Sequence, residues 1–286
     1  LQRAATSPDA ESASAVRVDP AVLVAALHFA DDAVAASETL GDDPELTFLR
    51  GVAARLRTGP ADAARWWTLL KHRGPDDVWQ RRALAETWLA QRAETNRPRT
   101  ARPEAIAHCL PTRNRPTLDG HFDELLWRAA QPIASAATPP ALARFGYDAH
   151  YLYLAVEVPK IAGQSYPLDL SPRPQDGADP ALDRIGIWLD SDRDYSTAYE
   201  LTVDCRGWPA DSVWGQSAWD PAWLVAQHAD DRHWYVEAAI AWSELTPVVP
   251  TGGDAWVAAL ERLLPGKAEA DSALAARSWW LECARL

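Results

Sequence analysis

Four tryptophans gather in one short segment of the chain, GWPADSVWGQSAWDPAW (207–223). They are Trp208, Trp214, Trp219 and Trp223, and the polar residues Asp211, Gln216 and Asp220 lie among them. An exposed indole can stack on the apolar face of a sugar ring while nearby carboxylates and amides hydrogen-bond the hydroxyl groups. The same side chains also fill hydrophobic cores, because large aromatic residues dominate core packing. The segment is therefore either a ligand-binding surface or part of a core, and we predict that at least one of these indoles faces solvent.

A second candidate site is the acidic sequence DSDRDY (190–195), in which Asp190, Asp192 and Asp194 alternate after a predicted strand. Closely spaced carboxylates and carbonyls can hold Ca²⁺, which prefers oxygen ligands. The Gly and the distal Glu of an EF-hand loop are absent, so the alternative is a solvated acidic turn. We predict a possible structural Ca²⁺ at these three residues and no other cofactor.

The sequence offers little support for catalysis. It contains no nucleophile elbow, P-loop, dinucleotide fingerprint or zinc-binding His pair, and its seven histidines are scattered. The three cysteines, Cys109, Cys205 and Cys283, are too few for a disulfide framework and have no metal-binding spacing. We therefore predict that the chain is not an enzyme.

Composition limits the possible partners. The net charge of −12 argues against nucleic acid or an anionic membrane, since phosphate binding needs a basic surface. The apolar content of 48% argues against disorder, and the best apolar run, 21–30, is too short to span a membrane. The chain begins at Leu1 and contains no methionine, which we interpret as the mark of a processed or trimmed fragment.

The first third of the chain is predicted to be helical. Residues 1–18 are interpreted as a flexible lead-in and 19–95 as a helical domain whose first helix starts at Asp19-Pro20 and stops near Gly41. From Pro44 to Asp77 the sequence resembles a tetratricopeptide repeat, with its Gly, small Ala, aromatic and closing Pro at four positions: Gly51, Ala63, Trp67 and Pro75. The usual first-helix aromatics are replaced by Thr47 and Ala54, so a plain helical pack remains the alternative. In the family such repeats bind peptides or other proteins.

The rest of the chain is predicted to be β-rich. An Arg- and Pro-rich linker with a first strand occupies 96–112, and short strands separated by turn signals fill 113–286. This pattern favours an antiparallel β-sandwich of the jelly-roll kind. The fold class is therefore α+β and multidomain, with an N-terminal α-helical hairpin domain followed by the sandwich.

Four motifs in this region occur in a characteristic order. They are LDGHFDELLW (118–127), YLYLAVEV (151–158), RIGIWLD (184–190) and the pattern formed by Trp234, Val236, Glu237, Ala239, Ile240, Trp242 and Leu245. Together they resemble the family-nine carbohydrate-binding modules and their DOMON-like relatives. The resemblance implies a β-sandwich over 113–286, an ability to bind glycans, and in some relatives a structural calcium ion. Some of these relatives bind haem through a Met ligand, and this mode of haem binding is excluded here because the chain has no Met.

Characterised members of that family hold a sugar between two tryptophans, and this sequence departs from that arrangement. Gly186 stands at the position of an acidic residue, Glu200 at the position of a basic one, and 175–180 contains no aromatic residue. Ser278-Trp279 matches the family, but the usual final strand after it is expected to be missing or altered. If this chain binds sugar, we expect the site at 208–223.

Two functions follow as hypotheses. The first is a non-catalytic, exported or envelope-associated carbohydrate-binding module joined to a small helical domain. The alternative is a structural or protein–protein interaction subunit that keeps the sandwich and has lost the sugar site, because tryptophan is favoured at protein interfaces too.

Overall fold

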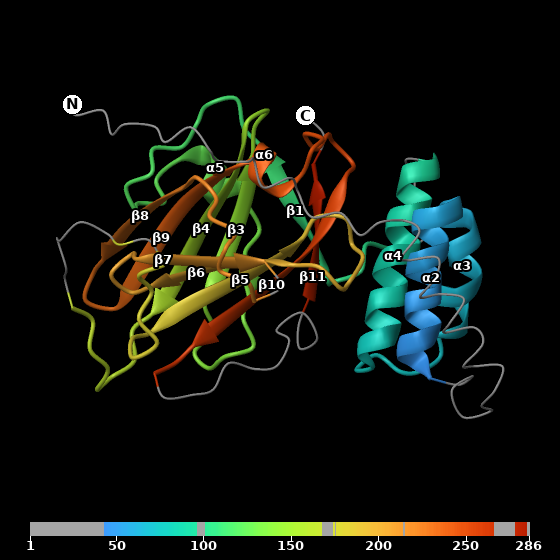
Figure 1. The fold of residues 1–286 in the computed structure, drawn as a ribbon, viewed down its shortest axis with the longest axis horizontal. Coiled ribbons are helices and arrows are strands. Elements are labelled where there is room, and N and C mark those ends of the chain that lie inside the picture. The colour runs from blue at the N-terminus through green and yellow to red at the C-terminus, as the bar shows by residue number, and fades with distance from the viewer. Residues whose placement is uncertain are drawn as a thin grey trace.

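The structure is a computed structural model that describes residues 43–95, 101–167, 174, 176–213, 215–265 and 278–284 (Figure 1). The predicted lead-in, the predicted helix over 20–41 and Trp214 lie outside these residues. In the described part of the chain, three long helices precede a large sheet that folds over on itself. No helix among the described residues is long and apolar enough to cross a membrane.

The helical unit consists of α2 (Pro44–Thr58), α3 (Pro60–Leu69) and α4 (Val78–Thr95). Asp43 caps α2 by accepting the backbone N–H of Glu45 at 2.8 Å. A predicted turn separates α2 from α3, where Gly59 takes a φ of 105° and Pro60 starts the next helix.

The helices α2 and α3 approach each other closely at one glycine. A Cβ atom on Gly51 would lie 2.3 Å from Nε1 of Trp67, whose ring is fully buried beside Ala63. The predicted hairpin is therefore confirmed, with Gly51 and Trp67 packed as expected. The repeat-like nature of this unit stays a prediction.

The sandwich is a single continuous sheet in the order β7-β6-β5-β10-β11-β1-β3-β4-β9-β8, with β2 paired to β3. The strands are β1 (Ile106–Pro111), β2 (Ile133–Ala134), β3 (Leu142–Tyr147), β4 (Tyr151–Pro159), β5 (Arg184–Asp190), β6 (Tyr199–Asp204), β7 (Pro209–Val213), β8 (Trp223–Ala229), β9 (His233–Ala241), β10 (Ala255–Leu263) and β11 (Ser278–Cys283). Two short helices, α5 (Leu125–Ala129) and α6 (Trp242–Leu245), complete the unit.

One feature of the sheet differs from the prediction. The pairing is not wholly antiparallel, because β1 runs parallel to both β11 and β3, with Ile106 opposite Trp280 and Leu110 opposite Gly146. The first strand thus links the two layers of the sandwich. Ser278-Trp279 starts β11, which lies between β10 and β1. Strand β7 follows a turn at Gly207, which has a φ of 80°.

The core lies between the two layers and follows the alternation of the strands. On β5, Ile185, Ile187 and Leu189 face this core, and the intervening residues face outward. A buried ion pair joins the neighbouring strands β10 and β5, since Arg262 Nε donates at 3.0 Å to Asp183, the residue before β5. Asp183 also accepts Trp234 Nε1 at 3.2 Å, so its charge is well compensated.

Two of the sequence motifs meet at one carboxylate. Glu237 accepts the backbone N–H groups of Asp119 at 3.0 Å and Gly120 at 2.7 Å. It also accepts Trp127 Nε1 at 2.6 Å. The Asp-Gly turn and the Glu of the Trp-x-Val-Glu strand therefore form one structural unit, in which the carboxylate satisfies three donors, two of them buried.

The helical unit packs against the outer face of β1, β11 and β10. Trp88 and Leu89 of α4 contact Ile106, Val257 and Trp280 in a second apolar cluster. Figure 1 shows α4 alongside β11, with α2 and α3 on its far side. The two units share a packed interface.

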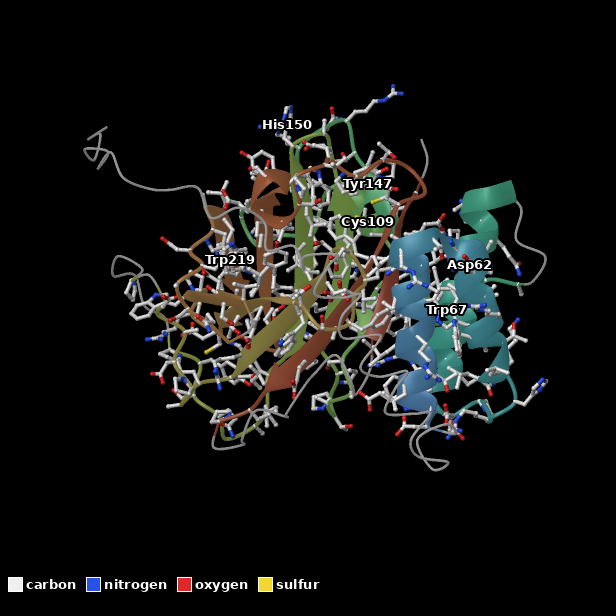
Figure 2. The ribbon with its side chains drawn as sticks, turned by 45° about the vertical axis from the view of Figure 1, so that its right-hand side comes forward. Asp62, Trp67, Cys109, Tyr147, His150 and Trp219 are labelled. Carbon is white, nitrogen blue, oxygen red and sulfur yellow. The ribbon has the colours of Figure 1, made fainter. Side chains whose placement is uncertain are left out.

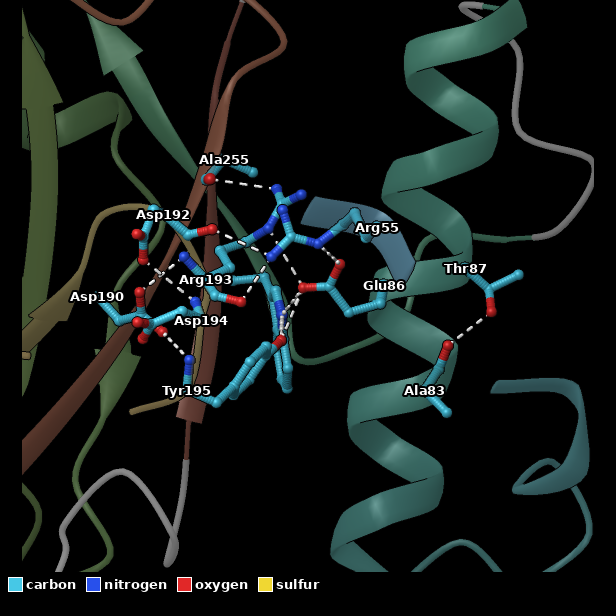
Figure 3. Close-up of polar contacts among 11 residues, drawn as sticks. Arg55, Ala83, Glu86, Thr87, Asp190, Asp192, Arg193, Asp194, Tyr195 and Ala255 are labelled. Carbon is cyan, nitrogen blue, oxygen red and sulfur yellow. Dashed lines mark hydrogen bonds and ion pairs between the residues drawn. The ribbon is translucent and has the colours of Figure 1, made fainter. Parts of the chain in front are cut away.

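A fully buried carboxylate holds this interface together. Glu86 on α4 accepts the Tyr195 hydroxyl at 2.7 Å and lies 3.2 Å from Arg193 Nε and 3.6 Å from Arg55 Nε (Figure 3). Trp280 Nε1 donates to the same Tyr195 oxygen at 2.8 Å. The network therefore connects α2, α4, β11 and the loop after β5.

We expect Glu86→Ala to lower the free energy of unfolding by about 3–5 kcal/mol, because it leaves two buried guanidinium groups without their shared anion. Urea denaturation followed by tryptophan fluorescence measures the change. The exposed Glu104→Ala is the control, expected within about 0.5 kcal/mol of the parent. Equal midpoints for the two variants would contradict a structural role for Glu86.

Candidate functional site

The tryptophan-rich segment joins the two ends of the folded sheet. Its first half includes β7 and its last residue starts β8, which are the two end strands in the sheet order. Trp223 Nε1 donates to Asp211 Oδ2 at 3.1 Å across this gap. The segment thus closes the open side of the sandwich.

The described tryptophans of this segment differ in exposure. Trp219 is only 6% exposed and packs against Tyr199 with the ring centroids 4.7 Å apart, so it belongs to the core (Figure 2). Trp208 is half-buried, and the guanidinium of Arg206 lies 3.7 Å from its ring centroid. Trp223 is half-buried beside Asp211. Trp219 is therefore a core residue. Because Arg206 covers one face of the Trp208 ring, at most the other face of that ring is available to a ligand.

The predicted polar residues also separate into two groups. Asp211 is buried and bonded to Trp223, whereas Gln216 and Asp220 are exposed. The backbone N–H of Gln216 donates to the carbonyl of Val213 at 2.9 Å. The structure thus brings Asp211 and Trp223 together and leaves the other two polar side chains at the surface.

Asp211 has an unusual electrostatic environment. Burial, with a further contribution from the carboxylates of Asp176 and Asp220, raises its pKa to about 6, and the hydrogen bond from Trp223 opposes this effect. Its Oδ1 atom is buried and has no hydrogen-bond partner among the described residues. The folded state therefore holds this proton more tightly than the unfolded chain does.

The consequence for stability has a definite sign. A raised acid pKa makes the folded state lose stability as the pH rises from the unfolded value toward about 6. Asp211→Asn retains an acceptor for Trp223 and removes the charge. The free energy of unfolding of this variant should therefore gain about 2 kcal/mol on that of the parent when the pH is raised from 4 to 7.5.

Urea denaturation at the two pH values tests this. The exposed Asp231→Asn serves as the matched control, with a difference from the parent that stays constant across the range. A constant difference for Asp211→Asn as well would show that Asp211 titrates normally.

The acidic loop, residues Asp190 to Tyr195, brings its three aspartates together. One carboxylate oxygen from each of Asp190, Asp192 and Asp194 lies within 4.8 Å of the others. The backbone bends sharply here, because Arg193 and Tyr195 have positive φ values of 57° and 61°. This geometry agrees with the spacing on which the calcium prediction rests.

The electrostatics of the loop suit a cation. Burial, followed by the charges of Asp194 and Asp192, raises the pKa of Asp190 well above its usual range. The backbone N–H groups of Arg193 and Tyr195 donate to Asp190 at 2.6 and 2.9 Å, which orients its carboxylate. The donor set is all oxygen, as Ca²⁺ requires, and calcium binding stays a prediction.

We expect millimolar Ca²⁺ to raise the melting temperature by a few degrees over EGTA, because binding to the folded state adds stability by mass action. Asp192→Asn, at an exposed loop position, should abolish the shift, and Asp123→Asn at another exposed position should keep it. Identical melting curves in Ca²⁺ and EGTA would refute the calcium prediction.

A tryptophan that the sequence reasoning did not select lies on the outer face of the sandwich. Trp188 is on β5, and its neighbours Ile187 and Leu189 point into the core, so its own side chain points outward. A Cβ atom on Gly186 would lie 2.4 Å from Cη2 of Trp188, which means that the six-membered ring of the indole packs over this glycine. Trp188 is half-buried, with its inner face on the sheet.

Polar side chains surround this ring. Strand pairing places Glu200 of β6 beside Trp188, and Thr202 of β6 and Glu261 of β10 on either side of Gly186. Ser212 Oγ lies 3.0 Å from Glu200 Oε2. We call Gly186, Trp188, Glu200, Thr202 and Glu261 the Trp188 face.

The Trp188 face lies on the same side of the sheet as the helical unit. The helix α4 covers the outward residues of β1, β11 and β10, and the Trp188 face continues from β10 across β5 to β6. The signal for it in the sequence is the Gly-x-Trp spacing within one strand. The spacing indicates a surface site only once the structure shows that no described helix covers this side of the strand.

A cleft of about 480 Å³ lies where the helical unit meets the sandwich. Its walls include Arg55, Glu86 and Arg193, which are already bonded within the interface network, and Val248, which is 67% exposed at the opposite wall. The lining also includes Asp192 and Asp254, so the cleft is mixed in polarity, and its largest charged cluster is already paired within the interface.

Comparisons of this chain with known proteins found similarity only among solved structures. No protein-family model and no curated protein matches it. Among solved structures it is similar to a family 9 carbohydrate-binding module from Caldicellulosiruptor kristjanssonii in complex with cellotriose, with 15% identity, a TM-score of 0.43, and coverage of 63% of this chain and 94% of that one. The glucose complex of a family 9 module from the same organism gives 16% identity, a TM-score of 0.41, and coverage of 63% and 96%. At these identities and TM-scores the likeness concerns the arrangement of the fold alone.

Proposed function

We propose that this chain is a non-catalytic carbohydrate-binding protein that stacks a sugar ring on the Trp188 face. The observation that carries the proposal is the close packing of the Trp188 indole over Gly186, on a side of β5 that no described helix covers. Residue 186 has to be glycine for this placement, since any Cβ would push the ring away from the sheet.

The chemistry of the face suits a sugar. A half-buried indole held against a sheet loses little conformational entropy on binding, and its outward face can contact the apolar C–H groups of a pyranose ring. The carboxylates of Glu200 and Glu261, which belong to half-buried residues, lie beside the ring as hydrogen-bond partners for hydroxyl groups. The acidic character of the face favours a neutral sugar over an anionic one.

The helical unit would act as a fixed wall beside this site. Its contacts through Glu86, Trp88 and Trp280 hold it against the same side of the sheet. In this proposal the protein works outside the cytoplasm on glycans, and the tetratricopeptide-like hairpin adds a surface for a protein partner.

Isothermal titration with a panel of neutral sugars, including glucose and cellotriose, tests the proposal. We expect saturable binding that Trp188→Ala weakens at least tenfold, which corresponds to about 1.4 kcal/mol. Trp66→Ala is the matched control, because Trp66 is also half-buried but lies on α3, and its affinity should equal that of the parent.

Two results would count against the Trp188 face. A flat response to every sugar would remove the carbohydrate function. Binding that survives Trp188→Ala but is lost in Trp208→Ala or Trp214→Ala would return the site to the segment selected from the sequence.

The second candidate function is a protein-interaction subunit, favoured by exposed leucines on the helices. Leu69 is 65% exposed, Leu56 is 39% exposed and Leu84 is 38% exposed. Exposed apolar side chains on a surface are a common feature of interfaces. This candidate gains support if the sugar panel gives no binding.

A further inference from the structure

Two of the three cysteines lie side by side in the sandwich core. Cys109 on β1 and Cys283 on β11 are direct partners in the parallel pairing of these strands. Each is 2% exposed, and both belong to the same core cluster, so their side chains point to the same side of the sheet. Both are free, buried thiols in this structure.

This placement meets the main requirement for a disulfide. Neighbouring strands lie about 4.8 Å apart, and disulfides join residues whose Cα atoms are about 4.4–6.8 Å apart. The two residues come from opposite ends of the sandwich sequence and meet only through the strand pairing. Cys205, at the end of β6, is buried by itself and is not part of this pairing.

We propose that Cys109 and Cys283, which are thiols in this structure, form a disulfide that fastens the last strand to the first. The oxidant is a small disulfide such as oxidised glutathione. One cysteine thiolate attacks it, releasing one reduced glutathione and forming a mixed disulfide. The second cysteine then attacks the mixed disulfide and releases the second reduced glutathione, so that two thiols and one disulfide become one protein disulfide and two thiols.

The bond forms during folding, before the core closes. Burial raises the pKa of the Cys109 thiol well above its usual range, so the folded protein offers almost no thiolate for exchange. Once formed, the bond is protected from reductants by the same burial. It persists in an oxidising compartment, where such bonds are commonly found.

The consequence is a covalent closure of the sandwich. All strands from β2 to β10 lie between the two cysteines in the sequence, so the bond encloses them in one loop. A cross-link that closes a long loop restricts the unfolded chain strongly. It also secures the end of β11, where Tyr147 donates its hydroxyl to the carbonyl of Ala284 at 2.7 Å.

The test is oxidative refolding of the full chain in a glutathione buffer, with a parallel sample in dithiothreitol. After denaturation without reductant, we expect one titratable thiol in the oxidised sample and all three in the reduced one. Mass spectrometry of the digest should show a single cross-linked pair containing Cys109 and Cys283. The oxidised sample should melt about 5–10 °C higher than the reduced one.

Two cysteine variants show which residues form the disulfide. Cys205→Ser should keep the cross-link and the higher melting temperature, whereas Cys283→Ser should lose both. Because a core substitution can itself impair folding, the comparison of oxidised and reduced parent protein stands as the independent measurement. Three free thiols after oxidative refolding, or a cross-link that includes Cys205, would overturn the proposal.

Discussion

Three neighbouring strands of this protein, β1, β11 and β10, carry buried apolar residues on both faces, and the rest of the architecture depends on that constraint. On one face Cys109, Leu281 and Ala258 belong to the sandwich core, and on the other Ile106 and Trp280 face outward. A sheet with two apolar faces must be covered on both sides to be stable in water. The helix α4 supplies the second cover, which makes the helical unit an integral layer of the fold.

The interface between helices and sandwich is also polar at its centre. Glu86 is 0% exposed and is surrounded by two arginines, a tyrosine and a tryptophan. A buried charge of this kind is tolerated only with such partners, and it restricts how α4 can sit on the sheet. The acidic loop contributes Arg193 and Tyr195 to this network, so its conformation and the docking of the helices are linked.

The tryptophans show how one residue type serves different purposes in one fold. Trp234, Trp242 and Trp280 are fully buried and supply volume to the packed layers, while their indole N–H groups bond to Asp183, Asp148 and Tyr195. Trp188 differs because it lies on the side of β5 that no described helix covers. Its availability to a ligand is therefore a property of the layer arrangement.

The sequence by itself determined the local structure of this protein. Gly59-Pro60 marked the turn between two helices, Gly51 and Trp67 marked their close contact, and the alternating residues of β4, β5 and β9 marked strands, because these features depend on neighbours along the chain. The three alternating aspartates likewise lie close together because they share one loop. Only the tertiary structure decided the parallel pairing of β1 with β11, the burial of Trp219 against Tyr199 and the open position of Trp188. Each of these depends on which distant strand or helix covers a given face, and the pattern of apolar and polar residues within one segment does not specify that partner.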